Sequence, residues 1–177
     1  MSDKGMVHVY YGDGKGKTTA ALGLAIRAAG CGKNVVIVQF LKGWNCGEHK
    51  TVSQIPNIEF IRGKPVSNKF VFEMTEDEKQ ETKASHDESL QKAIELIESG
   101  KCDVLIMDEV IEAYSLDVLD SELILGLIDR KPGSLEIIIT GHNSEPAFIE
   151  RADYITEMKK HKHPYDEGVT ARKGIEF

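Results

Sequence analysis

A glycine-rich stretch near the start of the chain carries the residues with the clearest chemistry. It reads Gly-Asp-Gly-Lys-Gly-Lys-Thr-Thr over 12–19 and follows the apolar run 7–11. Alternating glycines let successive backbone amides turn toward phosphate oxygens. Lys17 would neutralise phosphate charge, Thr18 would place a hydroxyl on magnesium, and the helix starting there would add its dipole. These features predict a phosphate-binding loop (P-loop) that holds a nucleoside triphosphate through Gly12, Asp13, Gly14, Lys15, Gly16, Lys17, Thr18 and Thr19.

The spacing of this loop is a variant of the usual pattern G-x-x-x-x-G-K-[ST]. Tyr11 stands where the first glycine is expected, and Gly12 follows one place later. A glycine-rich turn that binds nothing is the alternative. The order of apolar strand, Gly-Lys-Thr and alanine-rich helix favours the nucleotide site.

Two carboxylates end a second apolar run, at 104–109. In P-loop proteins an acid at such a strand end orients magnesium. We therefore predict that Thr18, Asp108 and Glu109 form the metal site. The alternative is that both acids cap the following helix.

Arg27 and His142 are weaker candidates, and the pair His161 and His163 is not favoured as a metal site. Arg27 is the only charged residue of the predicted helix 18–29, and it either reaches the nucleotide or is a solvated charge at the helix end. His142 follows a strand at the sheet edge where ligands bind in open α/β folds, or it is a surface-loop histidine. His161 and His163 lack a third ligand, so we predict solvated side chains there.

Runs of hydrophobic residues predict alternating strands and helices. Strands are expected at 7–11, 35–38, 58–61, 104–109, 135–140 and 154–158, and helices at 18–29, 75–99, 121–130 and 145–151. Continuous apolar runs such as 35–38 are typical of parallel strands buried on both faces. The alternation predicts one α/β domain over 1–177, with the doubly wound, mostly parallel sheet of the P-loop, RecA-like nucleotide-binding class.

Three segments carry more detailed expectations. Helix 18–29 is apolar nearly all round, which predicts burial on more than one side. Helix 75–99 opens with a capping box, and its polar first half predicts that only the second half packs deeply. The long loop 39–55, which contains the single tryptophan Trp44, is predicted to be functional.

Composition narrows the class of protein. The 177 residues carry a net charge of −7 with 41% hydrophobic content, which argues against nucleic acid as the main partner. Cys31, Cys46 and Cys102 show no C-x-x-C spacing and indicate a reducing compartment. The chain shows no signal-peptide pattern and no apolar run of membrane-spanning length, so a cytoplasmic location without membrane contact is expected.

Five stretches together resemble the P-loop type of ATP:corrinoid adenosyltransferase. They are Gly12–Ala21, Val38–Gly43, Met107–Glu109, Ile138–Gly141 and the tail Lys162–Phe177. The shifted loop glycine is that family's own form. The resemblance implies transfer of the 5′-deoxyadenosyl group of ATP to the cobalt of a reduced corrinoid, with triphosphate leaving and Mg²⁺ or Mn²⁺ present. It also implies ATP bound with its phosphate chain reversed, which turns C5′ toward the corrinoid.

The resemblance also assigns roles. Lys17 and Glu109 would be catalytic residues. Phe70 and Phe72 would lie against the lower face of the corrinoid and displace its axial base, so that cobalt(II) is easier to reduce. Other members often carry tryptophan at the second aromatic position and arginine at the position of His142. Implied partners are a flavodoxin-like or flavin reductase as electron donor and a second copy in a homodimer. The alternative for the two phenylalanines is packing against the sheet.

Two other classes compete with this interpretation. In a P-loop ATPase or kinase, Glu109 would polarise water or an acceptor hydroxyl for attack on the γ-phosphate. A nucleotide-binding regulator would bind ATP without turnover. The phosphate products separate them, because adenosyl transfer releases intact triphosphate. The residues do not select between a complete cobalamin and a precursor corrinoid.

Overall fold

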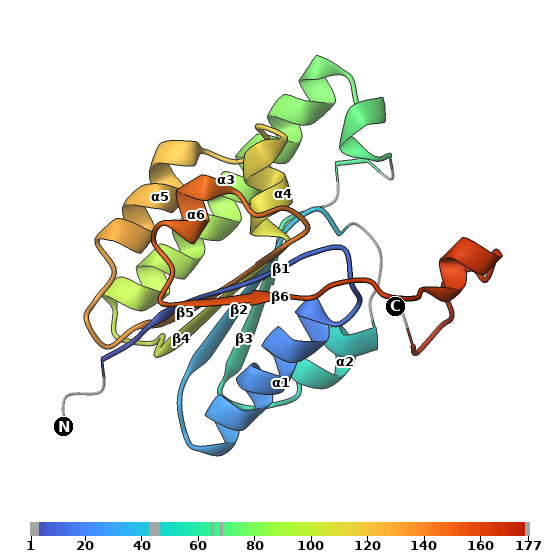
Figure 1. Ribbon diagram of the computed structural model, residues 1–177. Coiled ribbons are helices and arrows are strands. Elements are labelled where there is room, and N and C mark those ends of the chain that lie inside the picture. The colour runs from blue at the N-terminus through green and yellow to red at the C-terminus, as the bar shows by residue number, and fades with distance from the viewer. Residues whose placement is uncertain (1–3, 43–46, 65, 68, 176–177) are drawn as a thin grey trace.

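The chain is built around one parallel sheet, shown in the computed structural model of Figure 1. The structure describes residues 4–42, 47–64, 66–67 and 69–175. The sheet has six strands in the order β3-β2-β4-β5-β1-β6, and each neighbouring pair is parallel. The strands are β1 (Val7–Tyr11), β2 (Val35–Gln39), β3 (Ile58–Arg62), β4 (Val104–Asp108), β5 (Glu136–Gly141) and β6 (Tyr154–Glu157). The predicted α/β class with a parallel sheet is confirmed.

Helices cover both faces of this sheet (Figure 1). On one face lie α1 (Lys17–Gly30) and α2 (Gly47–Val52), and on the other α3 (Glu76–Glu98), α4 (Val110–Ser115), α5 (Ser121–Asp129) and α6 (Pro146–Ile149). Two short 3₁₀ turns, η1 (Val71–Glu73) and η2 (Pro164–Glu167), lie outside these layers. Among the described residues, no helix combines the length and apolar content that a bilayer crossing needs.

The central strands β2, β4 and β5 form because most of their side chains are apolar and buried on both faces. In β4, Leu105 and Met107 join the core under α3 to α6, while Val104 and Ile106 join the core under α1 and α2. This alternation buries the strand from both sides, as the continuous apolar run predicts. The described cysteines Cys31 and Cys102 are free thiols, and Cys46 lies outside the described residues.

The prediction for α1 is wrong. Only Ala21, Ala25 and Ala29 of this helix are buried, and Ile26 is 51% exposed on the outer face. A side chain added at Gly23 would meet nothing within 4 Å. Alanine favours helices on surfaces as well as in cores, so an apolar composition does not establish burial on several sides.

The prediction for α3 is half correct. Its capping box is present, because the Thr75 hydroxyl accepts from the Glu78 amide at 3.2 Å and the Glu78 carboxylate accepts from the Thr75 amide at 2.8 Å. The first half nevertheless packs deeply, through Thr82, His86 and Ser89. These polar side chains tolerate burial because they are hydrogen-bonded, as His86 Nδ1 is to the Val118 carbonyl at 2.8 Å.

The long loop after β2 is divided in the structure. Its second part forms α2, where a loop was predicted. Residues 43–46, which include Trp44, lie outside the described residues. The first part, 40–42, lies at the carboxyl end of β2 beside the carboxyl end of β4, where the Phe40 amide donates to the Asp108 carbonyl at 3.0 Å. Ligands bind at this edge in open α/β sheets, and the predicted site residues gather there.

Candidate functional site

The P-loop is held against the segment that follows β6. The Gly14 amide donates to the Met158 carbonyl at 2.6 Å, and the Gly12 amide donates to the His142 carbonyl at 3.0 Å. A Cβ on Gly12 or Gly14 would lie 2.5 Å from the Met158 oxygen. The prediction that successive amides face phosphate is therefore wrong at these two positions, where glycine allows close backbone approach. Gly16 is required by its φ of 115° at the N-cap of α1.

Lys17 lies over its own loop. Its ammonium donates to the Gly12 carbonyl at 2.6 Å and to the Gly14 carbonyl at 3.0 Å. Burial lowers the pKa of Lys17, against the opposing effect of Glu112 and Glu109. A partly desolvated cation at the start of α1 is suited to a phosphate, because its charge is poorly screened there.

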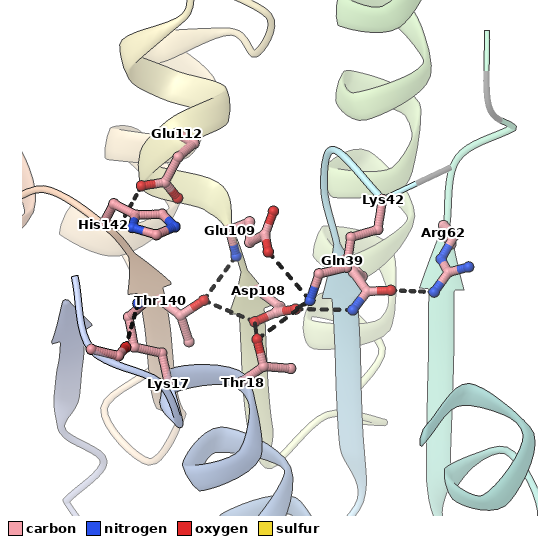
Figure 2. Close-up of polar contacts among 11 residues, drawn as sticks. Lys17, Thr18, Gln39, Lys42, Arg62, Asp108, Glu109, Glu112, Thr140 and His142 are labelled. Atoms are coloured by element: carbon pink, nitrogen blue, oxygen red, sulfur yellow. Dashed lines mark hydrogen bonds and ion pairs between the residues drawn. The ribbon is translucent and has the colours of Figure 1, made fainter. Parts of the chain in front are cut away.

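Asp108 is the centre of a polar cluster at the end of β4 (Figure 2). Its side chain is 2% exposed. Oδ1 accepts from the hydroxyls of Thr18 at 2.8 Å and Thr140 at 2.9 Å, and Oδ2 accepts from Gln39 at 2.9 Å and Lys42 at 3.0 Å. Burial alone would raise the pKa of Asp108, but Lys42 and the donated hydrogen bonds outweigh it and hold that pKa below its ordinary value.

Glu109 follows in an unusual backbone conformation. Its φ is 61° at the N-cap of α4, and its amide donates to the Thr140 hydroxyl at 2.8 Å. Left-handed conformation in a non-glycine residue costs roughly 1–2 kcal/mol, which the surrounding contacts must offset. Burial raises the pKa of Glu109, Lys42 opposes that effect, and Asp108 adds to it. The Glu109 side chain makes no capping hydrogen bond, so the helix-cap alternative fails for this acid.

The three predicted metal ligands meet at one point, which the Lys42 ammonium marks. Its Nζ lies 3.0 Å from Asp108 Oδ2, 3.3 Å from Glu109 Oε1 and 3.4 Å from the Thr18 hydroxyl. An all-oxygen set of this kind suits Mg²⁺, which keeps several water or phosphate ligands. Within the described ranges no three His, Cys, Asp or Glu side chains form a metal-binding group. Asp108, Glu109 and Thr18 supply three oxygens, so water or phosphate oxygens would have to complete the coordination of a cation here.

A cavity of about 340 Å³ opens beside this cluster. Glu109, Glu112 and His142 line one part of it, and Phe70 and Phe72 line another. Volumes of this order are usual for small-molecule sites. The cavity therefore joins the charged cluster to the predicted aromatic pair.

Phe70 and Phe72 stack on each other beside α3. Their ring centroids are 5.4 Å apart with planes 5° from parallel. The two residues are 61% and 79% exposed. The alternative in which they pack against the sheet is therefore wrong. They present an apolar aromatic surface at the mouth of the cavity.

His142 belongs to the site through Glu112, which the sequence interpretation missed. The His142 backbone amide donates to Glu112 Oε1 (Figure 2), and Glu112 Oε2 is buried without a hydrogen-bond partner. Glu112 lies in the first turn of α4, three residues after the N-cap residue Glu109, and both acids line the cavity. That spacing is the signal that could have identified it.

Four other members of the cluster also escaped prediction. Lys42, Gln39 and Thr140 bond to Asp108, and Arg62 donates to Gln39. Lys42 and Gln39 lie at the end of β2 and Thr140 near the end of β5, the two strands that flank β4. Their place at the carboxyl edge is a usable signal once the strand order is known.

The remaining predicted residues do not join the cluster. Arg27 lies in the last turn of α1, at the opposite end from the P-loop. The Asp13 carboxylate accepts from the Lys160 amide at 2.9 Å and faces the tail. Lys15 and Thr19 have exposed side chains. The structure thus brings together Lys17, Thr18, Asp108, Glu109 and His142, with Phe70 and Phe72 across the cavity.

Comparison with known proteins gives a family match over almost the whole chain. The model for "ATP:corrinoid adenosyltransferase BtuR/CobO/CobP" matches residues 3–177. Corrinoid adenosyltransferase CobA of Salmonella typhimurium is 34% identical over 100% of this chain and 88% of its own. Corrinoid adenosyltransferase of Pseudomonas aeruginosa is 31% identical over 99% of this chain and 85% of its own. A solved structure, EssC (ATPases 2 and 3) from Geobacillus thermodenitrificans, has a TM-score of 0.48 at 12% identity, covering 98% of this chain and 35% of that chain.

Proposed function

This chain belongs to the ATP:corrinoid adenosyltransferase family, and we propose that its cluster and cavity transfer the 5′-deoxyadenosyl group of ATP to the cobalt of a reduced corrinoid. The observation that carries the residue assignment is the convergence of Thr18, Asp108 and Glu109 on the Lys42 ammonium. Lys42 and Glu109 in turn line a cavity whose other edge is aromatic. The activity belongs to adenosylcobalamin synthesis or salvage.

The bond changes define what the residues must do. Cobalt(I) supplies an electron pair to C5′, and the C5′–O bond breaks with its pair leaving on triphosphate. No proton is transferred in this step. Cobalt(I) is already a strong nucleophile, so the chain has to align it with C5′ and stabilise the charge that collects on the leaving group.

We assign binding of the triphosphate leaving group to the P-loop end of the site. Lys17 and the N-terminus of α1 would face the triphosphate, with the phosphate chain reversed so that C5′ points to the cavity. Thr18, Asp108 and Glu109 would hold Mg²⁺ or Mn²⁺, which when bound neutralises charge on the triphosphate. The oxygen-only donor set supports that assignment.

The aromatic end is assigned the corrinoid. Phe70 and Phe72 would cover its lower face in place of the axial base, leaving cobalt(II) four-coordinate and easier to reduce. Their exposure supports the role, because exposed apolar surface of this kind is characteristic of binding sites. His142 and Glu112 line the cavity together with Glu109, and we propose that they contact the bound substrates.

Partners and location follow from the family resemblance. We propose a flavodoxin-like or flavin reductase as electron donor, a homodimer as the working form, one domain over 1–177 and a cytoplasmic setting. The free thiols of Cys31 and Cys102 suit a reducing compartment. The ATPase or kinase alternative is not favoured by the family match.

Product analysis tests the proposal. Full-length protein is incubated anaerobically with ATP, Mg²⁺ and cobalamin reduced to cobalt(I), and the corrinoid spectrum and phosphates are followed. We expect a light-sensitive adenosylated corrinoid and one triphosphate per turnover. Stoichiometric ADP, or no cobalt–carbon bond with both substrates saturating, would overturn the proposal.

A further inference from the structure

Lys42 stands where a divalent cation is expected. We propose that the Lys42 ammonium occupies the metal position when no metal is bound. It therefore competes with a divalent metal ion, so that tight metal binding depends on the triphosphate. This inference rests on the metal role proposed above for Thr18, Asp108 and Glu109. It predicts an order of binding: the metal binds tightly only together with the nucleotide, and it binds weakly when the nucleotide is absent.

The first support is geometric. One atom, Lys42 Nζ, lies within 3.4 Å of an oxygen from each of the three residues assigned to the metal. The Lys42 side chain is only 17% exposed. In Figure 2 it extends from the end of β2 across to Asp108. Its ammonium and a metal ion cannot share that point.

The second support is electrostatic. Asp108 and Glu109 are two neighbouring carboxylates with side chains 2% and 31% exposed, and such a pair needs a nearby positive charge. Lys42 supplies it. A metal ion that binds the same oxygens must displace the ammonium or lie against it, and two cations at contact distance repel strongly in a partly buried site. The triphosphate relieves this conflict, because it offers oxygens to the metal and a new anionic partner to Lys42.

The third support is the backbone that carries Lys42. Leu41 has a φ of 59°, its amide donates to His86 Nε2 at 3.3 Å, and the Lys42 amide donates to the Phe40 carbonyl at 2.7 Å. His86 is itself fixed by the Val118 carbonyl. The turn after β2 is therefore held from α3, so that the lysine stem is directed at the acids by the fold.

The test measures Mn²⁺ binding to the full chain in the absence of nucleotide and corrinoid. Binding is monitored through the loss of the EPR signal of free Mn²⁺. Lys42→Gln keeps a donor for Asp108 and removes the charge. Removing a unit charge at contact distance should tighten Mn²⁺ binding about tenfold or more relative to wild type. Lys42→Arg, which keeps the charge, should bind as weakly as wild type.

Two control variants test whether the gain in Mn²⁺ affinity is specific to Lys42 and its contact with Asp108. Lys33→Gln removes the same charge from an exposed position before β2 and should leave Mn²⁺ binding unchanged. Lys42→Gln combined with Asp108→Asn should lose the gain. Equal Mn²⁺ affinity in wild type and Lys42→Gln, or an equal gain in Lys33→Gln, would overturn the proposal.

A second measurement uses the wild-type chain, so that the proposal stays testable if the variants do not fold. Trace acetylation of Lys42, read by mass spectrometry, should rise several-fold at saturating Mn²⁺, because the ammonium must leave the acids. An unchanged rate would overturn the proposal. Neither readout involves adenosyl transfer, so a negative result here leaves the proposed function standing, and loss of that function leaves these measurements interpretable.

Discussion

The two ends of the cavity are built in opposite ways. Asp108 is buried and accepts hydrogen bonds from Thr18, Thr140, Gln39 and Lys42. Phe70, at the N-cap of the 3₁₀ turn η1, and Phe72, within it, are instead exposed and stack on each other. Charge stabilisation requires groups that are already oriented, because reorientation during the reaction costs free energy. An apolar surface only has to be available. We infer that the charged end is prearranged and that the aromatic end completes its packing when the corrinoid arrives.

The largest effect should come from Lys17→Ala. The change removes the cation over the P-loop and leaves its glycines intact, so kcat/KM for ATP with cobalt(I) cobalamin should fall about a hundredfold or more, as for the loss of a preoriented electrostatic contact. Lys33→Ala, an exposed lysine remote from the loop, is the matched control. Undiminished turnover at subsaturating ATP would show that the charged end does not act on the phosphates.

Asp108→Asn should have the next largest effect. The amide cannot accept from all the donors that surround it, and leaving such buried groups unsatisfied costs about 1–3 kcal/mol. The free energy of unfolding should therefore fall, and the Mg²⁺ concentration for half-maximal turnover should rise. Asp117→Asn alters an exposed acid in the loop before α5 and serves as control. Unchanged metal dependence would remove Asp108 from the metal site.

His86, which supports the turn between the two ends, should give a smaller, pH-dependent effect. Burial lowers its pKa, against the opposing hydrogen bond to Val118. At pH values between the folded-state pKa and the ordinary pKa of histidine, the unfolded chain therefore binds more protons than the folded chain. Because of this difference, His86 makes the free energy of unfolding fall as the pH drops below about 6.5. The difference in Tm between wild type and His86→Gln should narrow across that range. A constant difference would contradict this prediction.

Local pattern predicted much of this fold and part of the site. The P-loop and the acids of β4 are contiguous in sequence, so spacing alone identified Lys17, Thr18, Asp108 and Glu109. Lys42 and Thr140 reach Asp108 only because β2 and β5 flank β4, which no local pattern records. The roles of Gly12 and Gly14 depend on Met158, far along the chain. The burial of His86 depends on hydrogen bonds that a polar run does not reveal.

The division of labour between the two ends is tested most directly by Phe72→Ala assayed in two ways, starting from cobalt(II) cobalamin with a reductase and from chemically prepared cobalt(I) cobalamin. Only the first route needs the axial base displaced for reduction. We predict that the cobalt(II) route loses roughly threefold to tenfold more activity than the cobalt(I) route, since an aromatic contact is worth about 0.5–1.5 kcal/mol. Equal losses in the two assays would contradict this prediction and show that Phe72 does not act in displacing the axial base.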